Sequence, residues 1–537
     1  MTGNRATHRA AFFTLAMAGT ALATPALAQD AAVDARIEAL EARIEALEAQ
    51  NRQLVDLVRQ QQAAQASAAE AASQASTAPS GQAAPVGTAS AQSSAAANNS
   101  LGTGLVGIDS AYAFQMLDVA ENVDTKPLIQ LQTIQQGRLS DRITLSGGLT
   151  AIADYQISDK PSKFGYLTRH PTSGNQVGKH VSEAVIHSAE LAVTGRLTQD
   201  LTGYFELLYD PEQSFGSGTL TDLNRNQIQL RRGWIMWGNL DKRPVYALIG
   251  KMDIPFGFNG TVSPFTPSTN YHAFAGLAYG AQLGYFGGGV HVRAMAIQGG
   301  AQFRSANTPV KGTNVPSRLN NFALDANYTL ALSHYGSFML GGSYQHGTAY
   351  CQVYPVAHFN QCPDNTPAWA AYGVAKLGGF TLMGQYAQTT KVWQGTEVPQ
   401  VDPRIGTFVS PPQQIWLVSP NPLSIFDAKK PRSFSVGGRY EFGAAIPSPQ
   451  RRKNAVSLEF SRFIAGANDS PWEGQSQTVL GLSRFITPSV NLFGEVIYVD
   501  GFVPLNFLSG GNFADGSTWS DQGVDNELLV LGVQAAF

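Results

Sequence analysis

The chain has 537 residues, a formal net charge of -3 and only 14% charged residues. So small a net charge argues against a nucleic-acid partner. Basic residues are also nowhere clustered with aromatic ones, as they are in nucleic-acid binding sites. The 54 glycines, 28 phenylalanines and 18 tyrosines suit the tight wall and aromatic girdles of a membrane β-barrel better than a soluble enzyme. No apolar run after the first 28 residues is long enough for a transmembrane helix.

The first residues have the features of a secretory signal peptide. Basic residues precede an apolar stretch at 10–23, and Ala26-Leu27-Ala28 has the small-x-small form of a cleavage site. A transmembrane anchor fits less well, because this stretch falls short of the span of about 20 residues that a bilayer needs. We expect residues 1–28 to be removed on export and the mature protein to begin near Gln29.

Residues 29–61 contain a heptad pattern. Residues 35–41 are repeated without change at 42–48, and the apolar residues recur every three and four positions. The a positions are Ile37, Ile44, Asn51 and Val58, and the d positions are Leu40, Leu47 and Leu54. The pattern predicts a short α-helical coiled coil in the periplasm that joins copies of the chain into a homo-oligomer. Ile at a with Leu at d favours a coiled coil of two helices, whereas membrane barrels commonly form trimers. The number of chains in the oligomer therefore stays open.

Two segments connect the heptads to the rest of the chain. Residues 62–100 are almost entirely Ala, Ser, Gln, Gly, Thr and Pro, too poor in large apolar residues to build a core, so they predict a linker. Residues 101–141 are less distinctive. Leu128, Leu131 and Ile134 could form a short amphipathic element that either enters the barrel or lies beneath it.

Residues 142–537 predict an all-β transmembrane barrel of about sixteen antiparallel strands. In the first segment, apolar residues such as Leu149 and Tyr155 alternate with polar ones such as Thr150 and Gln156, so one face meets lipid and the other meets water. The same alternation continues through short turns and longer loops to the closing segment, which ends on the aromatic Phe537. The expected strands are 142–156, 183–197, 201–210, 227–238, 244–254, 277–286, 289–303, 321–331, 336–346, 368–377, 379–388, 433–442, 455–463, 477–485, 491–500 and 527–537.

The parity of these strands predicts which charged residues face the lumen. They carry both signs. Pairing across strands to hold the wall together explains them at least as well as a role in selecting solutes. The inward candidates are Asp154, Glu190, Arg196, Glu206, Arg231, Arg293, Asp325, Arg439, Glu441, Glu459 and Glu495. Arg232 is an exception, because parity places it toward lipid with Trp234 and Met236. Either a bulge shifts the register there or the strand assignment is off by one.

The third long loop, residues 255–276, contains no Asp, Glu, Lys or Arg. In sixteen-stranded barrels this loop commonly folds inward and narrows the lumen. Here it would present Phe256, Phe258, Phe265, Tyr271, His272 and Phe274. Such a lining suits a bulky, partly apolar solute. The alternative is that these rings pack the loop against the inner wall.

The only two cysteines, Cys351 and Cys362, fall in one predicted outer loop. In an exported chain, such a pair most simply forms one disulfide. A metal site would need further ligands, and only His346 and His358 are near, without a recognised spacing. No catalytic motif and no cofactor motif stands out, so the sequence predicts neither an enzyme nor a metal site.

Three motifs of the barrel resemble a known family. They are Gly250-Lys251-Met252-Asp253-Ile254-Pro255-Phe256-Gly257, Gly280-Ala281-Gln282-Leu283-Gly284-Tyr285 and Gly299-Gly300-Ala301-Gln302-Phe303-Arg304. With the heptads and the linker, they make the mature chain similar to the siderophore porin family typified by the legiobactin receptor. The resemblance implies a sixteen-stranded outer-membrane barrel that takes up ferric siderophore without a plug domain, and it names no ligand residue. A more distant similarity to phosphate-selective porins extends to the architecture alone.

These observations predict an outer-membrane channel in contact with lipid and a small-molecule solute. Uptake of a ferric siderophore or a similar bulky solute is the first hypothesis, and a general diffusion porin is the second. A structural barrel that tethers the cell envelope is the third. A heptad helix and a low-complexity linker cannot fold into the plug of a TonB-dependent receptor, so we expect uptake without an energised plug.

Overall fold

The structure is a computed structural model, and it describes most of the C-terminal four fifths of the chain. The described residues are 106–118, 125–161, 164–166, 178–210, 214–215, 223–224, 227–298, 301–303, 306–308, 318–332, 335–351, 364–393, 429–446, 451–464, 466, 473–501 and 523–537. The predicted signal peptide, coiled coil and linker lie outside these ranges.

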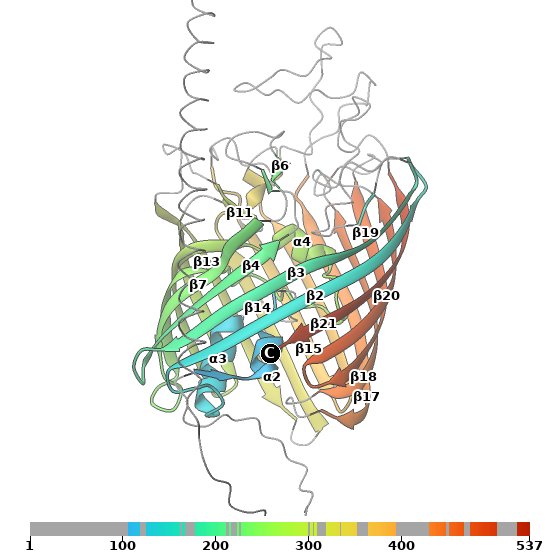
Figure 1. Cartoon of the computed structure of the whole chain (residues 1–537). Helices are drawn as coiled ribbons and strands as arrows, with labels where there is room; N and C mark the ends of the chain where they lie inside the picture. Colours follow the sequence, from blue (N-terminus) through green and yellow to red (C-terminus); the bar gives the residue numbers. More distant parts are fainter. Residues whose placement is uncertain are drawn as a thin grey trace, which may run out of the picture. The chain divides into compact units, whose positions relative to one another are not determined.

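Sixteen antiparallel strands form a closed barrel, as the sequence predicted (Figure 1). Each strand pairs with its neighbours along the chain, and the last strand pairs with the first to complete the wall. The strands are β2 (Ile143–Ser158), β3 (His180–Arg196), β4 (Leu201–Asp210), β7 (Gln227–Gly238), β8 (Val245–Asp253), β9 (Leu277–Gly287), β10 (Val290–Gln298), β13 (Leu319–Ala331), β14 (Gly336–Gln345), β15 (Ala368–Leu377), β16 (Phe380–Thr389), β17 (Arg432–Ala445), β18 (Arg452–Ile464), β19 (Gly474–Thr487), β20 (Val490–Gly501) and β21 (Asp525–Ala536).

The alternation of side chains decides which face of the wall each residue occupies. In β2, Leu149 is 42% exposed on the outside, whereas its neighbour Thr150 is fully buried inside. The same contrast separates Leu529 from Val530 in β21. Because successive side chains of a strand point to opposite faces, one apolar and one polar face result. The outer face is that of a barrel made for lipid.

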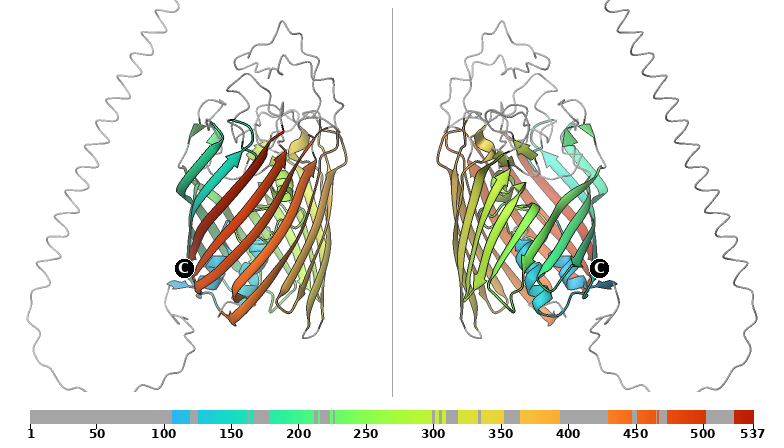
Figure 2. Two further views of the ribbon diagram at one scale, coloured as in Figure 1. Left: turned by 90° about the vertical axis from the view of Figure 1, so that its right-hand side faces the viewer. Right: turned by 90° about the vertical axis from the view of Figure 1, so that its left-hand side faces the viewer.

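The two ends of the barrel differ in the length of their connections (Figure 2). Tight turns gather at one end, here called the turn end, and long connections at the other, called the loop end. In the turn between β9 and β10, Gly288 and Gly289 adopt φ values of +60° and +81°, which favour glycine because it has no Cβ. Two small hairpins lie in the connections: β5 (Ser214–Phe215) with β6 (Leu223–Asn224), and β11 (Ala301–Phe303) with β12 (Ala306–Thr308). The predicted strand 289–303 is therefore divided between β10 and β11.

The C-terminal Phe537 takes part in closing the wall. It exchanges two backbone hydrogen bonds with Gly147 of β2, with N···O distances of 2.9 and 3.0 Å. Its ring lies so close to Gly147 that a Cβ there would come within 2.8 Å of three ring atoms. A small residue opposite the final aromatic ring thus lets the last strand seat against the first, and no unpaired strand edge is left for lipid to meet.

We expect deletion of Phe537 to lower the fraction of protein that reaches the heat-resistant folded state. The deletion removes both hydrogen bonds to Gly147 and the ring that covers it. Heat-modifiable mobility on gels measures this fraction directly in isolated membranes. Phe537→Tyr keeps the ring and the backbone and serves as the control. Equal assembly of the deletion and the control would show that the terminal residue has no part in closure.

A segment that precedes the first barrel strand lies inside the barrel near the turn end (Figures 1 and 2). It consists of β1 (Val106–Ile108), which pairs in parallel with β2, and the helices α2 (Ser110–Gln115) and α3 (Lys126–Gln135). The Asp109 side chain begins α2 by accepting a hydrogen bond from the backbone N–H of Tyr112 at 2.8 Å. Among the described residues, no helix has the length and apolarity needed to cross a membrane.

Candidate functional site

The third long loop folds into the barrel, where it crosses to the opposite wall. It leaves β8 at Ile254 and returns to β9 through α4 (Thr269–Phe274), for which Ser268 is the N-cap. Near its start, the backbone N–H of Gly257 donates to Ser343 of β14 at 2.9 Å. Farther along, the loop contacts β17 to β20, on the far side of the lumen from β8.

Two glutamates of the wall hold the tip of this loop. Glu459 of β18 accepts hydrogen bonds from the backbone N–H of Val262 at 2.9 Å and from the Thr261 hydroxyl at 2.8 Å. Glu495 of β20 accepts from the backbone N–H of Phe265 at 2.8 Å and from both the N–H and the hydroxyl of Thr266. Both glutamates are about 1% exposed. Both side chains point into the barrel, but the loop covers them, so the described structure uses them as anchors of the loop.

Glycines in the wall make room for the loop. A Cβ at Gly437 would come within 2.5 Å of Val262, and a Cβ at Gly481 would come within 2.4 Å of Pro264. Helix α4 is held by the wall as well: the N–H of Thr269 donates to Ser461 at 3.0 Å, and the Asn270 side chain donates to Gln385 at 2.9 Å. The loop is therefore fixed at several points along its length.

Most of the aromatic rings of the third loop are buried rather than exposed to the lumen. Phe256, Phe265, His272 and Phe274 are all less than 8% exposed. Phe265 stacks on Phe493 of β20 with a centroid distance of 5.1 Å. The two other predicted rings, Phe258 and Tyr271, are half-buried, and Phe258 stacks on Tyr372 at 5.8 Å. Of the six rings named from the sequence, these two are the more accessible.

The N-terminal segment is fixed inside the barrel by a buried cluster of charges. Asp118 follows α2, and Lys126 begins α3. Arg232 of β7 donates to Asp118 at 2.6 Å, while Lys126 lies 3.2 Å from Glu206 of β4. Arg231 also pairs with Asp118, at 2.9 Å. Burial lowers the pKa of the Lys126 ammonium, and Arg232 acts in the same direction. The candidates Glu206 and Arg231 thus face inward but bind the segment.

A β-bulge explains why two neighbouring arginines both point inward. Glu206 lies opposite Arg232 whereas Leu207 lies opposite Leu230, so Arg231 is the extra residue in β7. The bulge turns Arg232, Trp234 and Met236 inward, and all three are at most 3% exposed. The placement of these residues toward lipid by simple parity is wrong, and the bulge is the correct one of the two alternatives.

The remaining predicted charges lie in different parts of the lumen. Arg293 of β10 pairs with Asp325 of β13 at 2.8 Å across neighbouring strands. Arg196 pairs with the exposed Asp141 at the turn end, at 2.7 Å. Glu190 accepts the backbone N–H of Asp118 at 2.8 Å. Asp154 is buried in β2, where the Gln156 amide donates to it.

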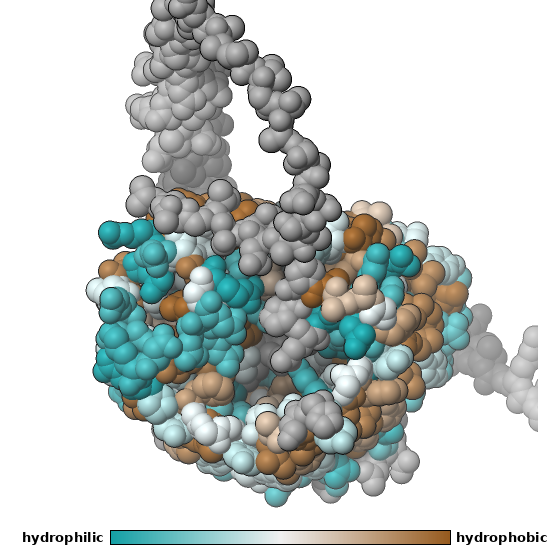
Figure 3. Space-filling model, turned by 90° about the horizontal axis from the view of Figure 1, so that it is seen from below, coloured by the Kyte–Doolittle hydropathy of each residue, from teal (hydrophilic) through white to brown (hydrophobic). Residues whose placement is uncertain are grey.

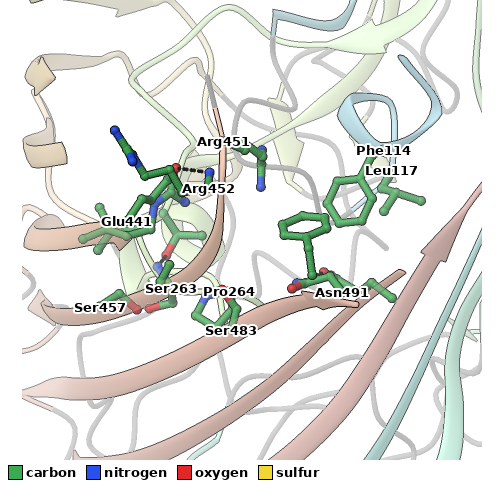
Figure 4. Close-up of a pocket in the computed structure, with 16 residues that line it drawn as sticks. Phe114, Leu117, Ser263, Pro264, Glu441, Arg451, Arg452, Ser457, Ser483 and Asn491 are labelled. Atoms are coloured by element: carbon green, nitrogen blue, oxygen red, sulfur yellow. Dashed lines mark hydrogen bonds and ion pairs between the residues drawn. The ribbon is translucent and has the colours of Figure 1, made fainter. Parts of the chain in front are cut away.

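A pocket lies between α2, the underside of the third loop and the wall from β17 to β21. It is lined by Phe114, Leu117, Thr261, Val262, Ser263, Pro264, Arg439, Glu441, Arg451, Arg452, Ala455, Ser457, Ser483, Phe485, Asn491 and Gln534 (Figure 4). Arg439 and Glu441 were named from the sequence, and they form an ion pair of 2.9 Å here. Arg451 and Arg452 were missed, because they follow a turn where parity gives no direction.

Seen from the turn end, the protein surface is uneven in polarity (Figure 3). Hydrophilic residues gather over one part of the rim, and hydrophobic residues lie along much of the outer edge. The hydrophobic outer edge agrees with an apolar outer wall.

Cys351 is disulfide-bonded and ends a short 3-10 helix, η4 (Ala349–Cys351). Cys362 lies outside the described residues, so the pairing of Cys351 with Cys362 stays a prediction. Within the described ranges, no three His, Cys, Asp or Glu side chains are grouped so as to hold a metal ion.

No protein-family model and no curated protein matches this chain. Among solved structures, it is similar to the outer membrane channel DcaP of Acinetobacter baumannii, with 15% identity and a TM-score of 0.44 over 74% of this chain and 97% of that one. An anion-selective porin from Comamonas acidovorans is 13% identical, with a TM-score of 0.44 over 74% of this chain and 99% of that one. OprB of Pseudomonas putida is 11% identical, with a TM-score of 0.42 over 77% of this chain and 96% of that one.

Proposed function

We propose that this protein is an outer-membrane channel through which small hydrophilic solutes diffuse. The observation that carries the proposal is a closed sixteen-stranded wall with an apolar outside, a polar inside and two segments that narrow the lumen from within. Both narrowing segments are fixed by buried hydrogen bonds and ion pairs, so the restriction is a permanent part of the barrel. The pocket beside α2 lies near the turn end, which we place in the periplasm.

The proposal predicts stable single-channel conductance in planar lipid bilayers. The full mature chain should conduct KCl in discrete steps, and a variant that begins near Leu101 should conduct equally, because it keeps the internal helices and the whole wall. Protein that is boiled before reconstitution is the control. A folded protein that passes no current would favour the structural barrel that tethers the envelope.

Ferric siderophore is the narrower form of this proposal. It is supported by the family resemblance and by the rings of Phe258 and Tyr271, which are the loop's more accessible aromatic surfaces. Uptake of labelled ferric siderophore by a deletion strain under iron limitation separates the two forms. Equal uptake with and without the protein, together with lost permeability to unrelated small solutes, would leave the general diffusion porin.

We also propose that copies of the chain associate through the heptads within residues 29–61. A solitary helix would leave the Ile and Leu seam exposed to water, whereas neighbouring helices would bury it. The proposal requires association and leaves two or three copies open.

A further inference from the structure

The pocket beside α2 has a polar side and an apolar side (Figure 4). Arg452, Glu441, Ser457 and Ser263 gather on one side, whereas Phe114 of α2 lies on the other. Arg451 lies between them, with its guanidinium carbon 5.5 Å from the Phe114 ring centroid and 5.9 Å from that of Phe485. A charged group placed over two rings is held by cation–π attraction. The pocket therefore presents charge and apolar surface to the same solute.

Among the side chains that line this pocket, positive charges outnumber negative ones. Three arginines and one glutamate line it, and the described lining contains no Lys, Asp or His. The glutamate, Glu441, accepts from Arg439 at 2.9 Å and from the backbone N–H of Arg452 at 3.1 Å. Its single negative charge offsets one of the three guanidinium groups. An anion in the pocket would meet a net attraction.

Two buried hydroxyls also face this space. Ser263 of the third loop and Ser457 of β18 are 2% and 3% exposed, and neither side chain has a hydrogen-bond partner among the described residues. A buried hydroxyl without a partner is energetically unfavourable, because it has lost its hydrogen bonds to water. Both line the pocket, so a guest with acceptor oxygens could take up their hydrogen bonds.

We propose that this pocket is a binding site for a small organic anion that carries an apolar group, occupied during passage through the barrel. The inference rests on the proposed channel function and names its preferred class of solute. A carboxylate accepts hydrogen bonds from arginine and from hydroxyl groups, and its apolar part lies against Phe114 and Phe485. Because Phe114 belongs to α2, the site is complete only when the N-terminal segment is inside the barrel.

The test is the interruption of KCl current by benzoate in planar bilayers, with the full mature chain. Benzamide has the same shape without the charge, and acetate has the charge without the ring. Benzoate should interrupt the current at lower concentration than either. Arg451→Gln should weaken the effect of benzoate about fivefold, the size of one ion pair in water, and leave benzamide unchanged.

Arg484→Gln is the matched control. Arg484 lies at the same end of β19 as Phe485, but it is exposed on the outer face, so its loss should change nothing. If Arg451→Gln fails to assemble, Ser457→Ala tests the same pocket and should also weaken benzoate selectively. Equal effects of benzoate and benzamide, or equal effects of the Arg451 and Arg484 variants, would overturn the inference. A wild-type protein that passes no current at all would instead contradict the channel function.

Discussion

Replacing Arg232 with methionine should cost the folded barrel about 3–5 kcal/mol, the usual cost of removing one partner from a buried ion pair. Arg232 is fully buried, and its guanidinium contacts Asp118 at 2.6 Å, Glu206 at 2.8 Å and Asp253 at 2.6 Å. Methionine fills much of the same space but donates no hydrogen bond. Unfolding by guanidinium chloride in detergent micelles, followed by heat-modifiable mobility, measures the loss.

Arg196→Met provides the control for this change. Its partner Asp141 is 94% exposed, and exposed pairs contribute only about 0–1 kcal/mol. Limited proteolysis adds a local readout, because Arg232 joins the N-terminal segment, through Asp118, to the wall. We expect cleavage near residues 106–118 in the Arg232 variant alone. Equal stability and equal protection of the two variants would show that the charge cluster does not hold the segment.

The sequence predicted the wall well because the wall obeys a local rule. A strand with one face in lipid and one in the lumen must alternate apolar with polar side chains. Each of the sixteen predicted ranges overlaps a strand of the barrel. The bulge at Arg231 breaks this rule. One inserted residue reverses the direction of every side chain beyond it. The sequence marked the place only through Arg232, a charged residue that simple parity put on the lipid face.

The contents of the lumen were harder to predict, because they depend on contacts between distant parts of the chain. Lys126 meets Glu206, which is 80 residues away, and Val262 meets Glu459, which is 197 residues away. The position of residues 255–276 as the third long loop predicted an inward fold. It did not reveal that the wall would bring glutamates to the loop's backbone, or that this would turn Phe265 toward Phe493.

Removing those glutamates should release the third loop and change the conductance. In the double variant Glu459→Ala and Glu495→Ala, the backbone N–H groups of Val262, Phe265 and Thr266 lose their acceptors. Each buried group left unbonded costs about 1–3 kcal/mol, so the attached state of the loop loses several kcal/mol. A loop that leaves the wall moves within the lumen. Single-channel recordings should then show noisier current and frequent transitions between conductance levels.

The control is Glu527→Ala, which removes a glutamate from an exposed position of β21 that does not contact the loop. It should conduct as quietly as the wild type. We expect the double variant to fold, because the wall strands keep all their backbone pairs. Heat-modifiable mobility checks this before the recordings are made. Quiet, unchanged current from a folded double variant would mean that apolar contacts such as Phe265 on Phe493 hold the loop without help from the glutamates. In that case Phe265→Ala, rather than loss of the two carboxylates, should produce the noise, since the stacked pair would then be the loop's main attachment to β20.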